Sequence, residues 1–338
     1  FFDQNKNSKI FKKAISIISS ELDEQFLSDG AHFELSPMYH SLAMEDLLDI
    51  INIHRNFSLT FPIDKFKEKY YKGMLWLKTM IYDNYELSHF NDCANGIAPT
   101  INEIENFAKK IGLNNRITQN SSFVYHKESG FVVYKDLNSH LIADFGKVGP
   151  DYIPGHAHAD TLSFELAIKG KRVIVNSGTN IYTKSDERIR QRGTSAHSTI
   201  EIENKNSSEV WSSFRVGKRA TPFNLKIEQE KKSILFSASH NGYKNLKNSP
   251  IHNREFNLKG NNWTIIDNLS GMGNEIVSRY YLHPEILIHK NELGFVISNK
   301  SENLALFKFK TDMCLKIIES SYSDRFGFKK SNKCILVS

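Results

Sequence analysis

The spacing of apolar residues is the feature that most limits how this chain can fold. Over the first third of its 338 residues, apolar side chains recur every three or four positions, the period of a helix buried on one face. The clearest stretch begins with a capping-box pair, Thr100 and Glu103, and ends at Gly112. Stripes of this kind lie at 11–22, 47–51, 74–81 and 101–111. We therefore expect a helical domain at the start of the chain.

After about residue 120 the apolar period changes to two, which is typical of half-buried strands. The alternation is clean over 197–203, and short β-rich runs at 131–134 and 172–175 are typical of buried strands. Many short strands separated by Asn, Gly, Lys and Ser turns favour an antiparallel sandwich over a parallel sheet. The pattern predicts an α+β protein with a helical domain over 1–115 and a β domain over 116–338.

Composition excludes several classes of protein. The net charge is +6, but its 44 Lys and Arg residues are scattered and form no basic run with interleaved aromatics, so we expect no nucleic-acid partner. A mildly basic surface suits a polyanion such as an acidic polysaccharide. No apolar run approaches the roughly 20 residues that cross a bilayer, so we expect no membrane insertion. The three cysteines are too far apart to form a metal site or a disulfide framework.

The richest motif for chemistry is the stretch 154–165, which contains His156 and His158. On an extended segment, residues two apart project to the same side, so both imidazoles can face one site. His197 follows, with an Asn-Ser-Gly-Thr turn at 176–179 in between. Imidazole moves protons near neutral pH and is the commonest metal ligand, so this cluster is a candidate active site. The alternative is that these are surface or core residues, since the chain has 13 histidines.

Several ordered motifs resemble the heparinase II/III family of polysaccharide lyases. They are DGAHFELSPMYH at 29–40, GHAHAD at 155–160, VIVNSGTNIY at 173–182 and RGTSAHST at 192–199, followed in order by HNGY at 240–243, HNR at 252–254 and YLHP at 281–284. The resemblance implies an incomplete α/α toroid followed by layered antiparallel β-sheets. Four helices are too few to close a toroid, and the chain begins with neither Met nor a signal peptide, so we expect a mature form or an N-terminally truncated chain.

The resemblance implies a carbon–oxygen lyase that cleaves a uronate-containing glycan, of glycosaminoglycan or alginate type, by β-elimination. Tyr39 would be the base and His156 the acid, with Tyr182 as a second tyrosine near the cleft. An ordinary phenol is a poor base, so Tyr39 needs nearby positive charge or a strong hydrogen-bond donor. The family also uses an Asn, usually beside a His, to neutralise the substrate carboxylate, and no residue of this sequence matches it.

Four further residues are predicted to bind substrate. Glu34 and His40 flank the Tyr39 segment, where Glu34 can contact sugar hydroxyls, orient a catalytic group or simply start a helix. Arg188 and Arg192 can pair with an acidic group of the substrate, or with the adjacent acidic pair at 186–187. The loop 91–96 is predicted to line the cleft, although a plain turn explains it nearly as well.

Some relatives hold a structural zinc with His, Asp and His, which match His158, Asn176 and His197 here. A neutral amide attracts a divalent cation much less than a carboxylate does. Three outcomes stay open: Asp160 completes the shell, a water completes it, or the metal is lost to a hydrogen-bond network.

Three functions compete at this point. The leading hypothesis is the lyase acting on an acidic polysaccharide. The second is a non-catalytic or biosynthetic glycan-binding protein of surface polysaccharide assembly with the same fold. The third is a zinc-dependent glycan hydrolase. The resemblance also implies a periplasmic or secreted bacterial location.

Overall fold

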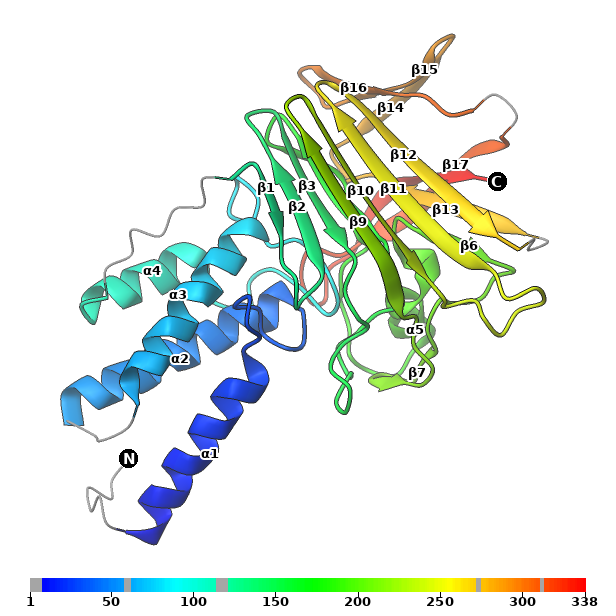
Figure 1. The fold of residues 1–338 in the computed structure, drawn as a ribbon. Helices are drawn as coiled ribbons and strands as arrows, with labels where there is room; N and C mark the ends of the chain where they lie inside the picture. The colour runs from blue at the N-terminus through cyan, green and yellow to red at the C-terminus, as the bar shows by residue number, and fades with distance from the viewer. Residues whose placement is uncertain (1–7, 58–61, 114–120, 272–274, 311–312) are drawn as a thin grey trace.

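The computed structural model describes residues 8–57, 62–113, 121–271, 275–310 and 313–338 (Figure 1). Four helices occupy one side of the molecule, and the β-sheets occupy the other, with one short helix beneath them. This arrangement confirms the predicted order of a helical part followed by antiparallel β layers. The predicted boundary at 115/116 lies outside the described residues.

The helical part contains α1 (Lys9–Gln25), α2 (Pro37–Phe57), α3 (Ile63–Thr79) and α4 (Ile101–Lys110). The predicted stripes fall in these four helices, although those at 74–81 and 101–111 run past the ends of α3 and α4. Both hydrogen bonds of the capping box at Thr100 are present. Helix α2 begins with Pro37, whose missing N–H costs nothing in the first turn. The apolar faces of α2, α3 and α4 share one core, which includes Met44, Leu77 and Ile104. None of the described helices is long and apolar enough to span a bilayer.

The β part is built from layers in which every described strand pair is antiparallel. The first sheet follows chain order: β1 (Phe123–Tyr125), β2 (Phe131–Lys135), β3 (Ser139–Asp144), β4 (Phe164–Ile168) and β5 (Lys171–Ile174). A second sheet has the order β12 (Asn262–Ser270), β11 (Ile251–Lys259), β10 (Ser233–His240) and β9 (Pro222–Glu230). Phe164 of the first sheet packs against Phe256 of the second, and Phe256 stacks on Phe236 with ring centroids 4.9 Å apart.

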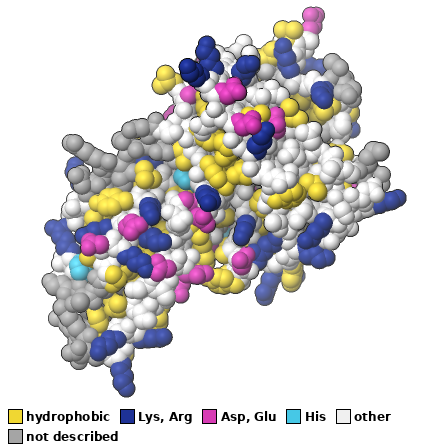
Figure 2. Space-filling model, in the orientation of Figure 1, with side chains coloured by type: hydrophobic (Ala, Val, Ile, Leu, Met, Phe, Trp, Pro, Cys, Tyr) yellow, Lys and Arg dark blue, Asp and Glu magenta, His cyan; other side chains and the backbone are white. Residues whose placement is uncertain are grey.

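Three smaller sheets complete the β part among the described residues. One has the order β17 (Leu315–Tyr322), β18 (Lys330–Val337), β13 (Ile276–Tyr281) and β6 (Ile200–Ile202). Another comprises β14 (Leu287–Asn291), β15 (Gly294–Ser298) and β16 (Asn303–Phe307). A hairpin pairs β7 (Val210–Trp211) with β8 (Arg215–Val216). On the face shown in Figure 2, Lys and Arg side chains are spread over both parts rather than gathered in one patch.

Local structure differs from the sequence prediction around the third histidine. The alternation at 197–203 predicts one half-buried strand, but only β6 is a strand and all three of its residues are buried. Before it lie the short helix α5 (Asp186–Arg192), which the apolar pattern did not predict, and a 3-10 turn at Thr194–Ala196. Helix α5 starts where the Ser185 side chain accepts the Arg188 N–H, a polar signal that apolar periodicity misses.

A mixed apolar and polar contact joins the two parts. Trp76 of α3 packs on Phe131 of β2, and its indole N–H donates to the Ser129 hydroxyl at 3.1 Å. Glu165 on β4 is fully buried, and it accepts the Tyr82 hydroxyl at 2.9 Å and the Arg172 guanidinium at 2.9 Å. Because these donors come from both sides of the boundary, the helical part and the β part share one interior.

Gly178 shows how closely the backbone packs behind the cluster of histidines. Its φ is +72°, and a Cβ built there would lie 1.8 Å from the Ser323 carbonyl oxygen. We expect Gly178→Ala to lower the free energy of unfolding by roughly 3 kcal/mol, from left-handed strain and the backbone clash together. Gly260→Ala is the matched control, because its φ is +53° but no atom lies within 4 Å of the new Cβ, so it should lose only about 1 kcal/mol. Equal losses of unfolding free energy for the two variants, measured by urea unfolding, would contradict this close packing at Gly178.

Candidate active site

A single buried carboxylate, Asp92, organises the site. It lies on the loop between α3 and α4, and its side chain has no exposed surface. Its oxygens lie 2.9 Å from His156 Nδ1 and 2.9 Å from His158 Nε2, and Thr179 donates to it at 3.3 Å. Arg188 binds it in bidentate fashion, with Nη2 2.6 Å from Oδ2. The helical part thus supplies the anion, and the β part supplies its donors.

The charges around Asp92 fix its ionisation and the tautomers of its partners. Burial alone would raise the pKa of Asp92, but hydrogen bonds from His156, His158 and Arg188 hold that pKa well below its usual range. An ionised carboxylate only accepts, so His156 carries its proton on Nδ1 and His158 on Nε2. Burial lowers the pKa of His158 to about 4, so this ring is neutral at pH 7. Each histidine is therefore left with one ring nitrogen that does not face Asp92.

Backbone groups of Asp92 also hold Tyr39 and His156, the predicted base and acid, in place. Ser36 donates its hydroxyl to the Asp92 carbonyl at 2.6 Å and accepts the Tyr39 N–H at 3.3 Å, which caps α2. The Asp92 N–H donates to the His156 carbonyl at 3.0 Å. Tyr39 and His156 are thus held by adjacent groups of one residue, although 117 positions separate them in the chain.

The structure brings Tyr39, His156 and Tyr182 together as the sequence predicts. The Tyr39 and His156 ring centroids lie 4.1 Å apart, and the Tyr39 hydroxyl lies 3.0 Å from the Tyr182 hydroxyl. Tyr39 comes from the first turn of α2, His156 from the loop before β4 and Tyr182 from the loop before α5. The His156 side chain is 21% exposed, so its ring is reachable from solvent. Their catalytic roles stay predictions.

Electrostatics distinguish the two tyrosines. Burial raises the pKa of Tyr39, and the negative charges of Asp92 and Glu34 raise it further, while the hydrogen bond from Tyr182 and the charge of Arg188 oppose that rise. Burial and the negative charge of Asp92 raise the pKa of Tyr182 far above its ordinary value. Tyr182 therefore keeps its proton and can donate it in a hydrogen bond to Tyr39. The N-terminus of α2 adds a favourable dipole for negative charge on Tyr39.

The four residues predicted to bind substrate have different surroundings. Glu34 is partly buried and lies close enough to His156 and Asp92 for their charges to affect its pKa, which burial raises. The predicted substrate contact does not fit the other three, because none of them has an exposed side chain. His40 lies in the helical interior with both ring nitrogens bonded to backbone groups of His32 and Gly73.

Each of the two arginines is already engaged by the protein. Arg188 binds Asp92, and Arg192 donates to the backbone carbonyls of Ala157 and Arg215. Both therefore position the segments that carry the histidines, and the adjacent acidic pair at 186–187 does not bind either guanidinium.

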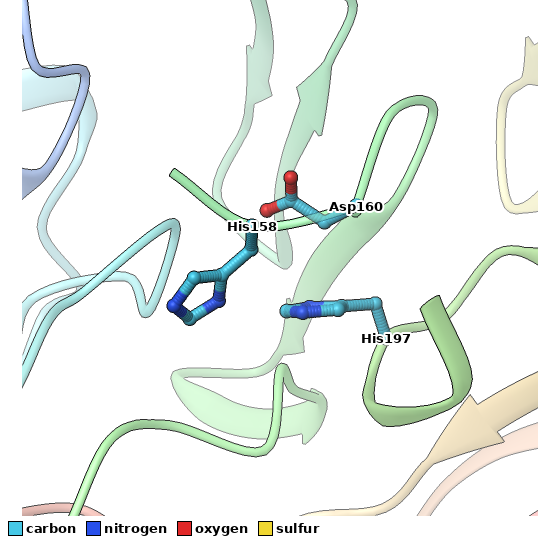
Figure 3. A group of neighbouring side chains, drawn as sticks. All are labelled: His158, Asp160 and His197. Atoms are coloured by element: carbon cyan, nitrogen blue, oxygen red, sulfur yellow. The ribbon is translucent and has the colours of Figure 1, made fainter. Parts of the chain in front are cut away.

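A second cluster of unpartnered atoms lies behind the catalytic candidates. Possible ligand atoms of His158, Asp160 and His197 all lie within 4.8 Å of one another, and the three side chains surround a common space (Figure 3). His158 Nδ1, Asp160 Oδ2 and His197 Nε2 are buried and have no hydrogen-bond partner. Burial raises the pKa of Asp160 to about 7, a penalty that a divalent cation would remove.

These residues fit a divalent metal, but not in the arrangement predicted from the motif alignment. Asn176 Oδ1 lies 2.9 Å from His197 Nδ1 and accepts its proton, so the amide orients the ring. Asp160, rather than Asn176, has an oxygen close to the two histidines, as in one of the alternatives left open above. Asp92 holds His158 in the same way from the other side. Such partners fix the tautomer of a metal-ligating histidine and raise its basicity.

Two residues of the site escaped sequence reasoning. Asp92 lies in the loop 91–96 that was predicted to line the cleft, but nothing local singles out this carboxylate, because all its donors are distant in sequence. Phe214 lies between β7 and β8, and its ring centroid is 5.7 Å from that of His156 and 5.2 Å from that of Tyr182. Only the fold brings that hairpin to the site.

The ion pair of Asp92 and Arg188 can be tested by removing one charge and then both. Asp92→Asn should lower the free energy of unfolding by about 3–5 kcal/mol, because it leaves the Arg188 cation buried without a counter-ion. The double variant with Arg188→Met should recover part of that loss. Asp23→Asn, at an exposed ion pair with Lys65, should change stability by less than about 1 kcal/mol. If the loss of unfolding free energy in the double variant, measured by chemical denaturation, equalled the sum of the losses in the two single variants, the ion pair would be contradicted.

Comparison with protein families gives two matches that together cover almost the whole chain. The model for the heparinase II/III N-terminus matches residues 2–118, and the model for the heparinase II/III-like C-terminal domain matches residues 118–337.

Individual relatives agree with the family match. A heparin-sulfate lyase of Bacteroides stercoris is 24% identical over 320 residues, which are 88% of this chain and 46% of that protein. One from Pedobacter heparinus is 27% identical over 61% of this chain and 34% of its own length. A crystal structure of heparan sulfate lyase from Pedobacter heparinus superposes with a TM-score of 0.73 at 19% identity, covering 96% of this chain and 53% of that one. A crystal structure of heparinase III superposes with a TM-score of 0.75 at 18% identity, covering 97% of this chain and 54% of that one.

The chain spans about half the length of these relatives or less. The C-terminal family model alone matches well over half of the residues, and the superposed structures share the fold. The chain therefore belongs to the heparinase II/III-like family.

Proposed function

We propose that this chain carries the acid–base machinery of a polysaccharide lyase that cleaves an acidic, uronate-containing glycan by β-elimination. The observation that supports it most is the Tyr39 ring against His156, with Asp92 behind the imidazole. The names of the relatives make heparan sulfate the first substrate to test.

The reaction moves two protons, one away from C5 of the uronate and one to the departing O4. The ionised Tyr39 oxygen takes the C5 proton, the C4–O4 bond breaks, and His156, which starts as the doubly protonated imidazolium, gives its Nε2 proton to the departing O4. The products are an unsaturated uronate and a chain with a new hydroxyl end. Asp92 stabilises the charged imidazolium that donates this proton, as a buried carboxylate does for a catalytic histidine elsewhere.

Tyr182 supports the base. Because its own pKa is raised well above the ordinary value, it stays protonated and can donate to the Tyr39 oxygen. That donor, the Arg188 charge and the start of α2 favour the ionised phenol, whereas burial and the negative charges of Asp92 and Glu34 disfavour it. The group that neutralises the substrate carboxylate has no match in this sequence, and we assign none.

The lyase proposal predicts loss of turnover in two single variants. Tyr39→Phe and His156→Ala should each lower kcat for heparan sulfate by about 10²-fold or more, because each removes one proton transfer. Formation of unsaturated uronate, followed by ultraviolet absorbance, is the measurement. Tyr85→Phe and His289→Ala, which make similar changes at exposed residues outside the site described above, serve as matched controls. Wild-type rates in the Tyr39 and His156 variants would refute the assignment.

A glycan-binding role without turnover is the second candidate, favoured by the unmatched carboxylate-neutralising Asn. Tight binding of an acidic glycan with no unsaturated product would select it. The zinc-dependent hydrolase would instead leave saturated ends and lose activity with chelators. A periplasmic or secreted location stays a prediction.

We also propose that His158, Asp160 and His197 hold one structural Zn²⁺, which would neutralise three orphaned ligand atoms and tie two loops together. Asn176 and Asp92 orient the two rings toward it. When bound, the ion supplies structural rigidity behind His156 rather than a reacting group.

The metal proposal is tested by stoichiometry and not by activity. Elemental analysis should find about one zinc per wild-type chain and none in Asp160→Asn, because a neutral amide cannot replace the ligand. Asn176→Ala should keep the ion but bind it roughly 10- to 100-fold more weakly in calorimetry, as loss of an orienting partner does. Retained zinc in Asp160→Asn together with lost zinc in Asn176→Ala would contradict the assigned ligands.

A further inference from the structure

The hairpin of β7 and β8 forms part of the active-site wall. Its turn residue Ser213 accepts the Arg188 Nε–H at 2.9 Å, so the cation that binds Asp92 also holds the hairpin. The neighbouring Phe214 packs edge-on against His156, with ring planes 78° apart, and edge-on against Tyr182. Phe214 is nonetheless 41% exposed, so one part of its ring faces solvent at the site.

The same hairpin presents a tryptophan to solvent. Trp211 ends β7 and is 56% exposed, an unusual setting for so large an apolar side chain. The next residue, Ser212, has a φ of +53°, a conformation that costs free energy in a non-glycine residue and concentrates at functional sites. Three residues of extended chain span at most roughly 11 Å, so Trp211 lies close to Phe214.

Beside Trp211 lies a hollow of about 430 Å³, within the range of small-molecule sites. We call it the hairpin hollow; its charged lining residues are Lys205, Glu209, Lys218, Arg219 and Lys244. Its floor is fixed to the rest of the site, because the Asn206 side chain accepts the Thr194 N–H at 2.9 Å, in the turn before His197.

The charges of the hairpin hollow are unbalanced. Among the described residues, no carboxylate pairs with Lys205 or Lys244, and both side chains are exposed. Glu209 is the only acid in the lining and already lies 3.9 Å from Lys218. Arg219 is engaged with backbone carbonyls of the loop 148–151. Two free ammonium groups beside an exposed indole therefore remain for a ligand.

We propose that the hairpin hollow is an outer subsite for an anionic sugar unit of the same chain that occupies the Tyr39 and His156 site. This inference rests on the proposed function. The indole offers a flat apolar surface to the C–H face of a sugar ring, and Lys205 and Lys244 offer charge to its carboxylate or sulfate ester. Phe214 connects the two positions along one hairpin.

Two linked subsites bind a long chain better than a short one, because the second contact becomes intramolecular. The preference for length is therefore the quantity that reports on the hairpin hollow. We would measure Kd by calorimetry for a heparan sulfate tetrasaccharide and dodecasaccharide, with Tyr39→Phe present in every protein so that no turnover intervenes. The Tyr39→Phe protein with an unchanged hairpin should bind the dodecasaccharide more tightly than the tetrasaccharide.

Trp211→Ala and the double variant Lys205→Gln/Lys244→Gln should each weaken dodecasaccharide binding by roughly fivefold and reduce the ratio between the two lengths. Lys231→Gln/Lys232→Gln is the matched control, because these exposed lysines lie at the opposite end of β10 from the hollow. The subsite proposal would be overturned if the ratio of the two Kd values stayed unchanged, or if both oligosaccharides lost affinity equally. It would also be overturned if the parent protein showed no preference for the longer chain. If the wild-type chain forms no unsaturated product but the length-dependent loss is seen, the lyase proposal fails and the subsite stands.

Discussion

The buried contact between Asp92 and its donors is the interaction on which the site depends. Placing a carboxylate and a guanidinium in a dry interior costs several kcal/mol per ion, which only close geometry and additional hydrogen bonds offset. Asp92 meets that condition, because Arg188, Thr179 and two imidazoles converge on its oxygens. An arrangement so demanding is satisfied by one relative position of the helical and β parts, and in that position Tyr39 lies against His156.

A second buried carboxylate repeats the principle nearby. Glu165 on β4 receives the Tyr82 hydroxyl and the His89 N–H from the helical side, and Arg172 and the Asn176 N–H from the β side. The two anions are therefore satisfied by both parts at once, so separating the parts would leave buried charges without partners. Behind them, the cluster of His158, Asp160 and His197 would be completed by a cation. Buried polar groups, together with the apolar contact of Trp76 and Phe131, therefore determine how the parts fit.

Much of the fold could be predicted from local patterns. The helices α1 to α4 follow apolar stripes, and the capping box at Thr100 marks its helix start because both partners lie within one turn. The strands β2 and β5 follow buried β-rich runs. The strand expected at 197–203 is reduced to β6, because the His197 N–H closes the preceding 3-10 turn and the His197 ring binds Asn176.

The site was predicted in part. Motif resemblance found Tyr39, His156 and Tyr182, whose juxtaposition the structure shows, but it misassigned the surroundings of His40, Arg188 and Arg192. A sequence does not show whether an arginine faces substrate or a buried aspartate, because that depends on a loop about a hundred residues away. For the same reason Asp92 and Phe214 carried no signal of their own.

At the centre of the site, one ionised carboxylate accepts hydrogen bonds from two histidines through different ring nitrogens. Nitrogen-detected NMR of the imidazoles, at a pH where they are neutral, tests it most directly. The account predicts opposite tautomers, with the proton on Nδ1 in His156 and on Nε2 in His158. The same tautomer in both rings, or a proton on Nε2 in neutral His156, would contradict it.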